Sequence, residues 1–296
     1  MKIPFTKAHG ARNDFLLTFW PTWTRNEPRA ATADFAAIAR AICDRHTGIG
    51  ADGWLLVDRP LVNSFINKAG GFADEADSGV DGRIDLWNSD GSTSPISGNG
   101  TRCAAAFLVE ARVEAGQATD LVRIATGAGV KDLTLLGQER SGDGHKFLFE
   151  MNMGSPDITE LHANVQGHDA VILDVGNPQC AVLVENFDFD WQSAGAAIES
   201  DPRFPNRTNV SFIRVLDPHT LEVQFFERGA GVTMSSGTGS TGAAAAASAR
   251  GLSDGQVEVQ TLAGPLQLRW KGEDILLAGP AEIIGNGEFY LEKIGG

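Results

Sequence analysis

A glycine-rich segment that leads into alanine occurs twice in the chain. The first copy, SGNGTRCAAA, spans Ser97–Ala106, and the second, SGTGSTGAAA, spans Ser236–Ala245, 139 residues later. Another pair of similar segments, IATGAGVKDLTL from Ile124 and VQTLAGPLQLRW from Val259, is separated by 135 residues. Two repeats in the same order and with nearly the same offset predict two similar halves, because a solenoid repeats with a much shorter period.

Length and charge limit the class of protein. At 296 residues and 42% hydrophobic content, the chain can form one large domain or two of ordinary size. Its formal charge of -14 repels polyanions, so we expect no nucleic-acid partner. The first residues, MKIPFTKAHGARNDF, lack the apolar core of a signal peptide, and no uncharged run reaches the roughly 20 residues that span a bilayer. We therefore expect a cytoplasmic protein with no membrane partner.

The cysteines and one glycine motif do not indicate a bound group. Cys43, Cys103 and Cys180 are widely spaced and form no C-x-x-C pair, which predicts reduced, buried thiols instead of a disulfide framework or a zinc site. GIGADG, residues 48–53, matches G-x-G-x-x-G but follows a helical pattern instead of a strand, so it does not predict a dinucleotide site. We expect no metal and no cofactor.

Short strands dominate the rest of the pattern. LEVQFF at 221–226 and AVLVENF at 181–187 alternate apolar and polar residues as strands do. The pattern predicts few helices, and the strand pattern that ends near Met151 marks the boundary between the halves. The predicted helices span Asp34–Asp44, Asn99–Ala115, Trp191–Glu199 and Thr238–Arg250.

Each glycine-rich repeat can bind an anion. A Gly/Ser/Thr turn before a helix leaves backbone N–H groups at the positive end of the helix dipole. If the halves are related by pseudo-twofold symmetry, Ser97 and Ser236 occupy matching places on opposite sides of a ligand. An enzyme that inverts a carbon centre needs that arrangement, with one group removing a proton and its counterpart delivering one. The alternative is that both serines only cap their helices, and the residues leave the two readings evenly balanced.

Polar turn segments supply further candidates. Asn13, Asn88, Asn177 and Asn209 each lie in one of the segments HGARNDF, WNSDGS, VGNPQ and RTNV, where an asparagine is more often a turn residue than a ligand contact. The ERGAG run, Glu227 to Gly231, would be a surface ion pair on the simplest reading. Because Arg228 is followed closely by an anion-binding turn, we favour a second carboxylate site there.

Taken in order, these fragments resemble the diaminopimelate epimerase family from end to end. The matching stretches are HGARNDF, DRHTGIGADG, WNSDGSTSPISGNGTRCAA, VGNPQCAV, RFPNRTNVSF and ERGAGVTMSSGTGS. The resemblance implies an α/β (α+β) fold of two pseudo-symmetric domains, each a curled, mostly antiparallel sheet around a central helix. The first domain would comprise residues 1–152 with 282–296 and the second 153–281, with the active site in the cleft between them.

The resemblance also implies a function and a substrate site. Members interconvert LL- and meso-diaminopimelate, in lysine and cell-wall biosynthesis, by proton transfer at the α-carbon without a cofactor. The α-carboxylate and amino group would meet the turns Gly98-Asn99 and Gly237-Thr238, and Glu227 would hold an amino group. The implied partner is a small amino-acid substrate, and a homodimer stays open. The residues that would fix the substrate are Asn13, Asn88, Asn177, Asn209 and Arg228.

The catalytic positions depart from the family pattern. The two family cysteines, which act as thiol and thiolate, correspond here to Ser97 and Ser236. Cysteine ionises near pH 8.5, whereas a serine hydroxyl is a much weaker acid and needs an adjacent base. Gln179 stands where the family has an imidazole, and Val232 where it has a carboxylate. Cys103 and Cys180 lie at motif positions that carry no proton transfer in the family.

Three functions remain open at this point. The first is an epimerase or racemase of this family in which Ser97 and Ser236 exchange the proton, with Glu227 as the third catalytic residue. The second is a divergent isomerase resembling the phenazine-biosynthesis isomerases, in which a carboxylate, Glu227 or Asp52, moves the proton. The third is a non-catalytic protein that binds an amino acid.

Overall fold

The structure is a computed structural model that describes residues 1–27, 30, 32–58, 79–114, 119–141 and 144–291. The chain forms two compact units. Unit 1 comprises Met1–Gly10, Asp14–Phe149 and Ala281–Gly296, and unit 2 comprises Ala11–Asn13 and Glu150–Pro280. Among the described residues, no helix is both long and apolar enough to cross a membrane.

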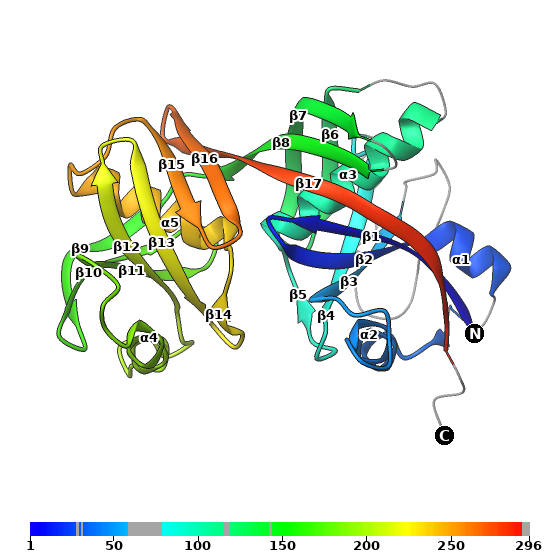
Figure 1. Ribbon diagram of the computed structural model, residues 1–296, viewed down its shortest axis with the longest axis horizontal. Helices are drawn as coiled ribbons and strands as arrows, with labels where there is room; N and C mark the ends of the chain where they lie inside the picture. Colours follow the sequence, from blue (N-terminus) through cyan, green and yellow to red (C-terminus); the bar gives the residue numbers. More distant parts are fainter. Residues whose placement is uncertain (28–29, 31, 59–78, 115–118, 142–143, 292–296) are drawn as a thin grey trace. The chain divides into compact units, whose positions relative to one another are not determined.

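Unit 1 is built mainly from strands (Figure 1). The strand β8 (Gly144–Gly154) continues from unit 1 into unit 2, and β17 (Asp274–Tyr290) continues from unit 2 into unit 1. The other elements of unit 1 are β1 (Lys2–Gly10), β2 (Asn13–Phe19), α1 (Trp20–Asn26), α2 (Phe35–Cys43), β3 (Gly53–Asp58), β4 (Gly82–Asn88), β5 (Thr93–Ser94), α3 (Gly98–Glu114), β6 (Leu121–Thr126) and β7 (Gly129–Ser141).

From its second strand on, unit 2 repeats this order of elements, with one helix in the place of α1 and α2. Its first strand, β9 (Asp157–Val165), pairs with the strand that follows it. The remaining elements are β10 (His168–Asp174), β11 (Pro178–Leu183), α4 (Trp191–Glu199), β12 (Asn209–Asp217), β13 (Thr220–Glu227), β14 (Gly231–Thr233), α5 (Gly237–Ala249), β15 (Gln256–Thr261) and β16 (Gly264–Lys271).

Strand pairing follows the same sequence in both units. In unit 1, β2 pairs parallel with β3, β3 antiparallel with β4, and β4 antiparallel with β5 and parallel with β6. In unit 2, β11, β12, β13, β14 and β15 occupy the same five places with the same directions. Each series ends in an antiparallel hairpin, β6–β7 or β15–β16. The two halves predicted from the repeats are confirmed as two copies of one topology.

Each unit has one central helix. In α5, every residue from Gly239 to Ala247 is buried, and Figure 1 shows the helix among the strands of unit 2. A helix that is buried on all sides must be small and apolar, which the alanine run Ala243–Ala247 provides. In unit 1, the buried part of α3 includes Cys103–Ala106 together with Leu108 and Val109. The predicted mixed α/β fold, with a mostly antiparallel sheet around a central helix, is confirmed.

Most predicted elements agree with the structure. Helices α2, α3, α4 and α5 match the predicted segments, except that the predicted end of α3 at Ala115 lies outside the described residues. The predicted strand at 221–226 lies within β13, and GIGADG follows α2, as expected. The predicted strand at 181–187 was too long, since β11 ends at Leu183. Asn186 bends the chain beyond it, because its side-chain oxygen accepts the Asp188 amide at 2.9 Å.

Candidate active site

The second repeat forms the start of α5. Ser236 is the N-cap, and its hydroxyl oxygen accepts the Gly239 amide at 3.0 Å. Its carbonyl accepts the Ser240 amide at 3.0 Å. These two bonds leave the amides of Gly237 and Thr238 unused by the cap, at the positive end of the helix. We call Ser236–Thr238 the unit 2 serine turn.

The first repeat builds the same turn at the start of α3. The Ser97 hydroxyl oxygen accepts the Gly100 amide at 3.1 Å, and its carbonyl accepts the Thr101 amide at 2.7 Å. The reading of both serines as helix caps is therefore correct. It does not exclude a chemical role, because a capping oxygen accepts a hydrogen bond and keeps its own proton to donate. We call Ser97–Asn99 the unit 1 serine turn.

In unit 2, a carboxylate lies beside the serine. The Ser236 hydroxyl donates to Glu227 Oε1 at 2.7 Å, and Ser236 is buried. Burial raises the pKa of Glu227, and the hydrogen bond from Ser236 opposes that shift without cancelling it. A carboxyl group with a raised pKa that already accepts the serine proton has the two properties of a general base.

In unit 1, an amide stands in the corresponding place. Asn88 ends β4 nine residues before Ser97, just as Glu227 ends β13 nine residues before Ser236. The Asn88 side chain donates to Ser92 Oγ at 2.9 Å. Within the part of the chain that the structure describes, no carboxylate or imidazole is hydrogen-bonded to the Ser97 hydroxyl. The two serine turns therefore share a backbone but not a base.

The unit 1 serine turn has a cation instead. Asn99 is buried, and its side-chain oxygen accepts a hydrogen bond from the guanidinium of Arg102. Arg102 is fully buried, and burial lowers its pKa to about 10, so it still carries a positive charge at neutral pH. The corresponding residue in unit 2, 139 positions later, is the neutral Thr241.

Several predicted binding residues of unit 2 are joined by hydrogen bonds. The Asn177 side chain donates to Thr238 Oγ1 at 3.3 Å, which links it to the unit 2 serine turn. The Asn209 side chain donates to the Pro178 carbonyl at 3.0 Å and accepts the Arg228 amide at 3.0 Å. Arg228 is exposed and directly follows Glu227. The structure therefore gathers the predicted unit 2 residues around the end of β13 and the start of α5.

Asn13 begins β2 after a turn with unusual backbone geometry. Ala11 and Arg12 have φ values of 49° and 61°, in the left-handed region where a side chain is strained. Unit 2 places Gly176, with φ 94°, immediately before Asn177. Gly10 packs tightly against the start of α3, because a Cβ added at Gly10 would lie 3.1 Å from the carbonyl oxygen of Asn99.

Sequence reasoning missed one buried acid near these residues. Glu199, at the end of α4, is buried, and its carboxylate accepts the Gly229 amide at 3.1 Å and pairs with Arg207. It thereby connects the segment after Glu227 to the segment before Asn209. The sequence offered one signal for a special role of Glu199. An acidic side chain in the last turn of a predicted helix is unfavourable, because it opposes the helix dipole.

Asp52 and the three cysteines are not available for proton transfer. Asp52 forms an ion pair with Arg45 at 2.8 Å and accepts the Asp14 amide at 3.1 Å, which ties up its carboxylate. Cys43, Cys103 and Cys180 are free and buried, as predicted. Burial raises the pKa of each thiol to about 12, so none supplies a thiolate in place of the two serines.

No described residues form a cluster of three or more acids, histidines or cysteines that could hold a metal ion.

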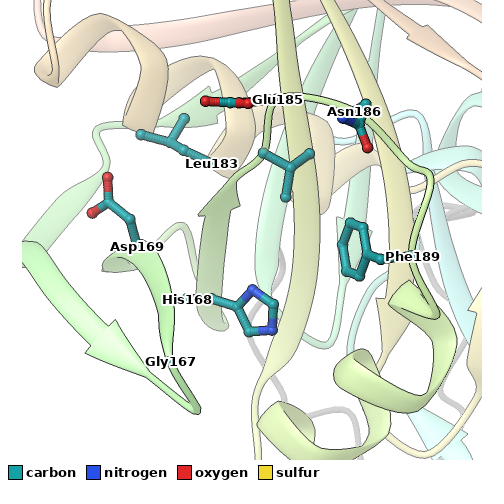
Figure 2. A pocket seen from close by; sticks show the side chains of 8 residues that line it. Gly167, His168, Asp169, Leu183, Glu185, Asn186 and Phe189 are labelled. Atoms are coloured by element: carbon teal, nitrogen blue, oxygen red, sulfur yellow. The ribbon is translucent and has the colours of Figure 1, made fainter.

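A surface hollow of about 330 Å³ in unit 2 is lined by the β9–β10 turn and the chain after β11, including His168, Asp169 and Phe189 (Figure 2). None of the predicted site residues lines it. The chemistry-bearing residues therefore lie elsewhere, at the two serine turns.

Comparison with known proteins identifies the family. The diaminopimelate epimerase family profile matches residues 5–159 and 171–284. The diaminopimelate epimerase of Pelotomaculum thermopropionicum is 34% identical, over 96% of this chain and 98% of the relative. A relative of the same name from Burkholderia pseudomallei is 33% identical, over 98% of this chain and 99% of the relative.

Solved structures share the fold at lower identity. The crystal structure of a hydroxyproline epimerase from Agrobacterium vitis matches with a TM-score of 0.69 at 14% identity, covering 97% of this chain and 90% of that one. A phenazine biosynthesis protein of the PhzF family from Bacillus anthracis matches with a TM-score of 0.65 at 15% identity, covering 98% of this chain and 100% of that one. The chain thus belongs to the diaminopimelate epimerase family, and it is an enzyme of the isomerase class.

Proposed function

We propose that the protein is a cofactor-independent, cytoplasmic epimerase that inverts an α-carbon of diaminopimelate, between the LL and meso forms, with both serine turns acting on the same carbon. The observation that carries this proposal is the hydrogen bond from Ser236 to Glu227, because it supplies a base to a serine that could not act alone. Membership of the family supports the substrate.

In the first step, the Ser236 oxygen takes the α-proton while its own proton passes to Glu227. The Cα–H bond breaks and a new O–H bond forms on Ser236, so the serine ends the step neutral and Glu227 ends it protonated. The raised pKa of Glu227 favours this transfer, because a carboxyl group that holds its proton more strongly is a better acceptor.

Negative charge then develops on the substrate carboxylate, where helix N-termini stabilise it. The Gly237 and Thr238 amides, which the Ser236 cap does not use, supply donors at the positive end of α5. The substrate is held in position by Asn13, Asn88, Asn177, Asn209 and Arg228.

In the second step, the Ser97 hydroxyl gives its proton to the opposite face of the carbon. The alkoxide left on Ser97 is stabilised by the Gly100 amide and the α3 dipole until it takes a proton from water, and Glu227 gives its proton back to water, which restores the enzyme. The buried charge of Arg102 adds to this stabilisation. This step is the harder of the two, because no base or acid assists Ser97 within the described residues of unit 1.

Among the described residues, a carboxylate assists Ser236 but no base or acid assists Ser97, and this difference favours one alternative function. An isomerase that moves a proton with a single carboxylate needs Glu227 alone, and Asp52 is already held by Arg45. Such an enzyme removes and returns the proton on one face, so it does not invert the carbon. A substrate with a more acidic C–H bond than a free amino acid would suit it.

Proton NMR of LL- and meso-diaminopimelate in heavy water separates these functions. The epimerase exchanges the α-proton for deuterium and interconverts the two isomers. Exchange without interconversion supports the single-carboxylate isomerase. If the α-proton signal persists while the ligand raises the melting temperature of the protein, the chain binds the amino acid without turning it over, and the proposal is wrong.

A further inference from the structure

A chain of side-chain hydrogen bonds leads from the interior of unit 2 to the start of α5. Gln179, which is only 1% exposed, donates from Nε2 to Asn177 Oδ1 at 2.6 Å. Asn177 in turn donates from Nδ2 to Thr238 Oγ1 at 3.3 Å. Thr238 belongs to the unit 2 serine turn, so a buried amide two residues along the strand from Asn177 is connected to the anion-binding end of the helix.

The order of donors in this chain decides what the exposed end can bind. Because the Asn177 oxygen accepts from Gln179, the Asn177 amide is held with its NH₂ group toward Thr238. The Thr238 oxygen accepts that bond, which leaves the Thr238 hydroxyl proton to donate elsewhere. The second N–H of the Asn177 side chain also stays available to donate to a ligand. A ligand at this turn therefore meets donors, as an oxyanion requires.

The fold itself does not need a polar residue at position 179. The equivalent residue of unit 1 is Phe15, which lies two residues after Asn13 as Gln179 lies two after Asn177. Phe15 is also buried, at 3% exposure, and pairs with the first residue of β3 as Gln179 pairs with the first residue of β12. An apolar side chain thus fills this place in one copy of the topology.

The polar side chain also carries a cost. Gln179 Oε1 is buried and has no hydrogen-bond partner among the described residues. A buried acceptor without a partner destabilises a protein, so a glutamine is a poor choice for packing alone. Since unit 1 shows that an apolar residue suffices, the benefit of Gln179 has to come from its bond to Asn177.

We infer that Gln179 is a positioning residue that fixes Asn177 and Thr238 as hydrogen-bond donors and so makes the unit 2 serine turn selective for a substrate carboxylate. This inference deepens the proposed function and rests on it for the identity of the natural ligand. The carboxylate selectivity itself can be tested with a simpler dicarboxylate.

The test is calorimetric titration at pH 8 with two probes, meso-diaminopimelate and pimelate, a dicarboxylate of the same length without amino groups. Gln179→Glu replaces the donor with an ionised acceptor, which forces the Asn177 amide to turn its NH₂ group away from Thr238. We expect the dissociation constant for both probes to rise about 10- to 100-fold, the effect of losing hydrogen bonds to a charged group. In a turnover assay the loss appears in KM more than in kcat.

Two further variants separate positioning from folding. Gln179→His keeps an N–H that can donate to Asn177, and we expect it to bind within about threefold of the parent protein, as a rescue of the donor requires. Gln224→Glu makes the same change in β13, at a residue that pairs with Phe212 and not with Asn209, the partner of Gln179, and we expect it to leave both dissociation constants within about twofold.

A fourth variant perturbs the same chain from the helix side. A Cβ added at Gly242 would lie 3.2 Å from Gln179 Cγ, so Gly242→Ala pushes Gln179 without touching the ligand. Alanine favours a helix over glycine. We therefore expect weaker binding without a lower melting temperature, a combination that a purely structural role for Gln179 does not give.

Unchanged affinity in both Gln179→Glu and Gly242→Ala would overturn the inference. So would failure of the parent protein to bind either probe. If the parent binds pimelate but neither binds nor epimerises diaminopimelate, the proposed function fails, while the pimelate affinities of the variants still decide the role of Gln179.

Discussion

The two serine turns have the same backbone and different surroundings. In each unit a serine caps the central helix through the amide three residues later, at 3.1 Å for Ser97 and 3.0 Å for Ser236. Nine residues before the serine, however, unit 1 has Asn88 and unit 2 has Glu227. The copies retained what the helix needs to begin and diverged in the groups that transfer protons.

The hairpins that follow the helices show the same conservation of structure. Thr126 Oγ1 donates to the Gly129 carbonyl at 2.8 Å, and Thr261 Oγ1 donates to the Gly264 carbonyl at 2.6 Å. Each of these hydroxyl oxygens also accepts the amide two residues later. Since these hairpins match in detail, the differences at the serine turns are local and come from single side chains.

We expect the largest effect when the carboxylate that distinguishes unit 2 is removed. Glu227→Gln gives unit 2 a neutral amide, as in unit 1. Because the base is lost while the shape is kept, we expect kcat for epimerisation to fall about 10²- to 10⁴-fold, with KM nearly unchanged. Steady-state kinetics with LL-diaminopimelate measure this, and a decrease of less than about fivefold would mean that Glu227 is not the base.

The same variant has a predicted pH signature in stability. Burial raises the pKa of Glu227 above its ordinary value of 4.5, so the folded protein keeps this proton to a higher pH than the unfolded chain does. The free energy of unfolding of the parent therefore falls as pH rises from about 4.5 through the folded pKa. Glu227→Gln lacks this fall, and we expect its melting temperature to exceed that of the parent at pH 7 and the difference to shrink by pH 4.

A gain of activity is expected when thiols replace the serines. Cysteine ionises near pH 8.5, so Ser97→Cys supplies an acid and base to the turn that has no carboxylate. We expect the epimerisation rate at pH 8 to rise about tenfold or more in Ser97→Cys, and less in Ser236→Cys, where Glu227 already assists. A larger gain at Ser236 than at Ser97 would reverse the assignment of unit 1 as the limiting side.

Stability should also distinguish the two serines. Ser97→Ala removes a helix cap and is expected to cost about 1 kcal/mol of unfolding free energy. Ser236→Ala removes a cap and also the 2.7 Å hydrogen bond to Glu227, so we expect about 1 kcal/mol more. Urea unfolding of both variants gives the comparison. Equal losses would show that the Ser236–Glu227 bond contributes no net stability.

The smallest expected effect concerns the strained turn before β2. Arg12 has φ 61°, whereas the turn before β11 has a glycine, Gly176, in front of its equivalent asparagine. Arg12→Gly removes the steric strain, although glycine also makes the unfolded chain more flexible. We expect a net stabilisation of about 0.5–1 kcal/mol, measured by urea unfolding, with Asp132→Gly in a strand as the destabilising control.

The sequence predicted the backbone of these regions better than their chemistry. The Gly/Ser turns and the alanine runs determine where α3 and α5 begin, and both were predicted to within one residue. Helix α1 was missed because it follows β2 directly, has no side-chain cap at Phe19 and is rich in aromatic residues that also favour strands. The apolar packing of Trp20, Trp23 and Phe35 stabilises it, which only the folded structure reveals.

Partners of polar residues could not be read from the sequence. The bond between Ser236 and Glu227 spans nine residues and depends on β14 placing the chain back beside β13. The bond from Asn177 to Thr238 joins residues 61 positions apart, and the bond of Glu199 depends on a turn at Gly229. Sequence motifs named the candidate residues, but their pairing follows from tertiary contacts.

The strand β17 gives the chain an order of assembly. Its residues 282–290 pair antiparallel with β1, whose first residue in the ladder is Lys2. β1 also pairs with β2, which follows it directly, but during synthesis it leaves the ribosome long before β17 exists, whereas the strands of unit 2 from β9 to β16 pair within a short stretch of chain. Pairing across so many residues is slow. Unit 2 should mature first, and the unit that contains β1 should be the last to finish folding.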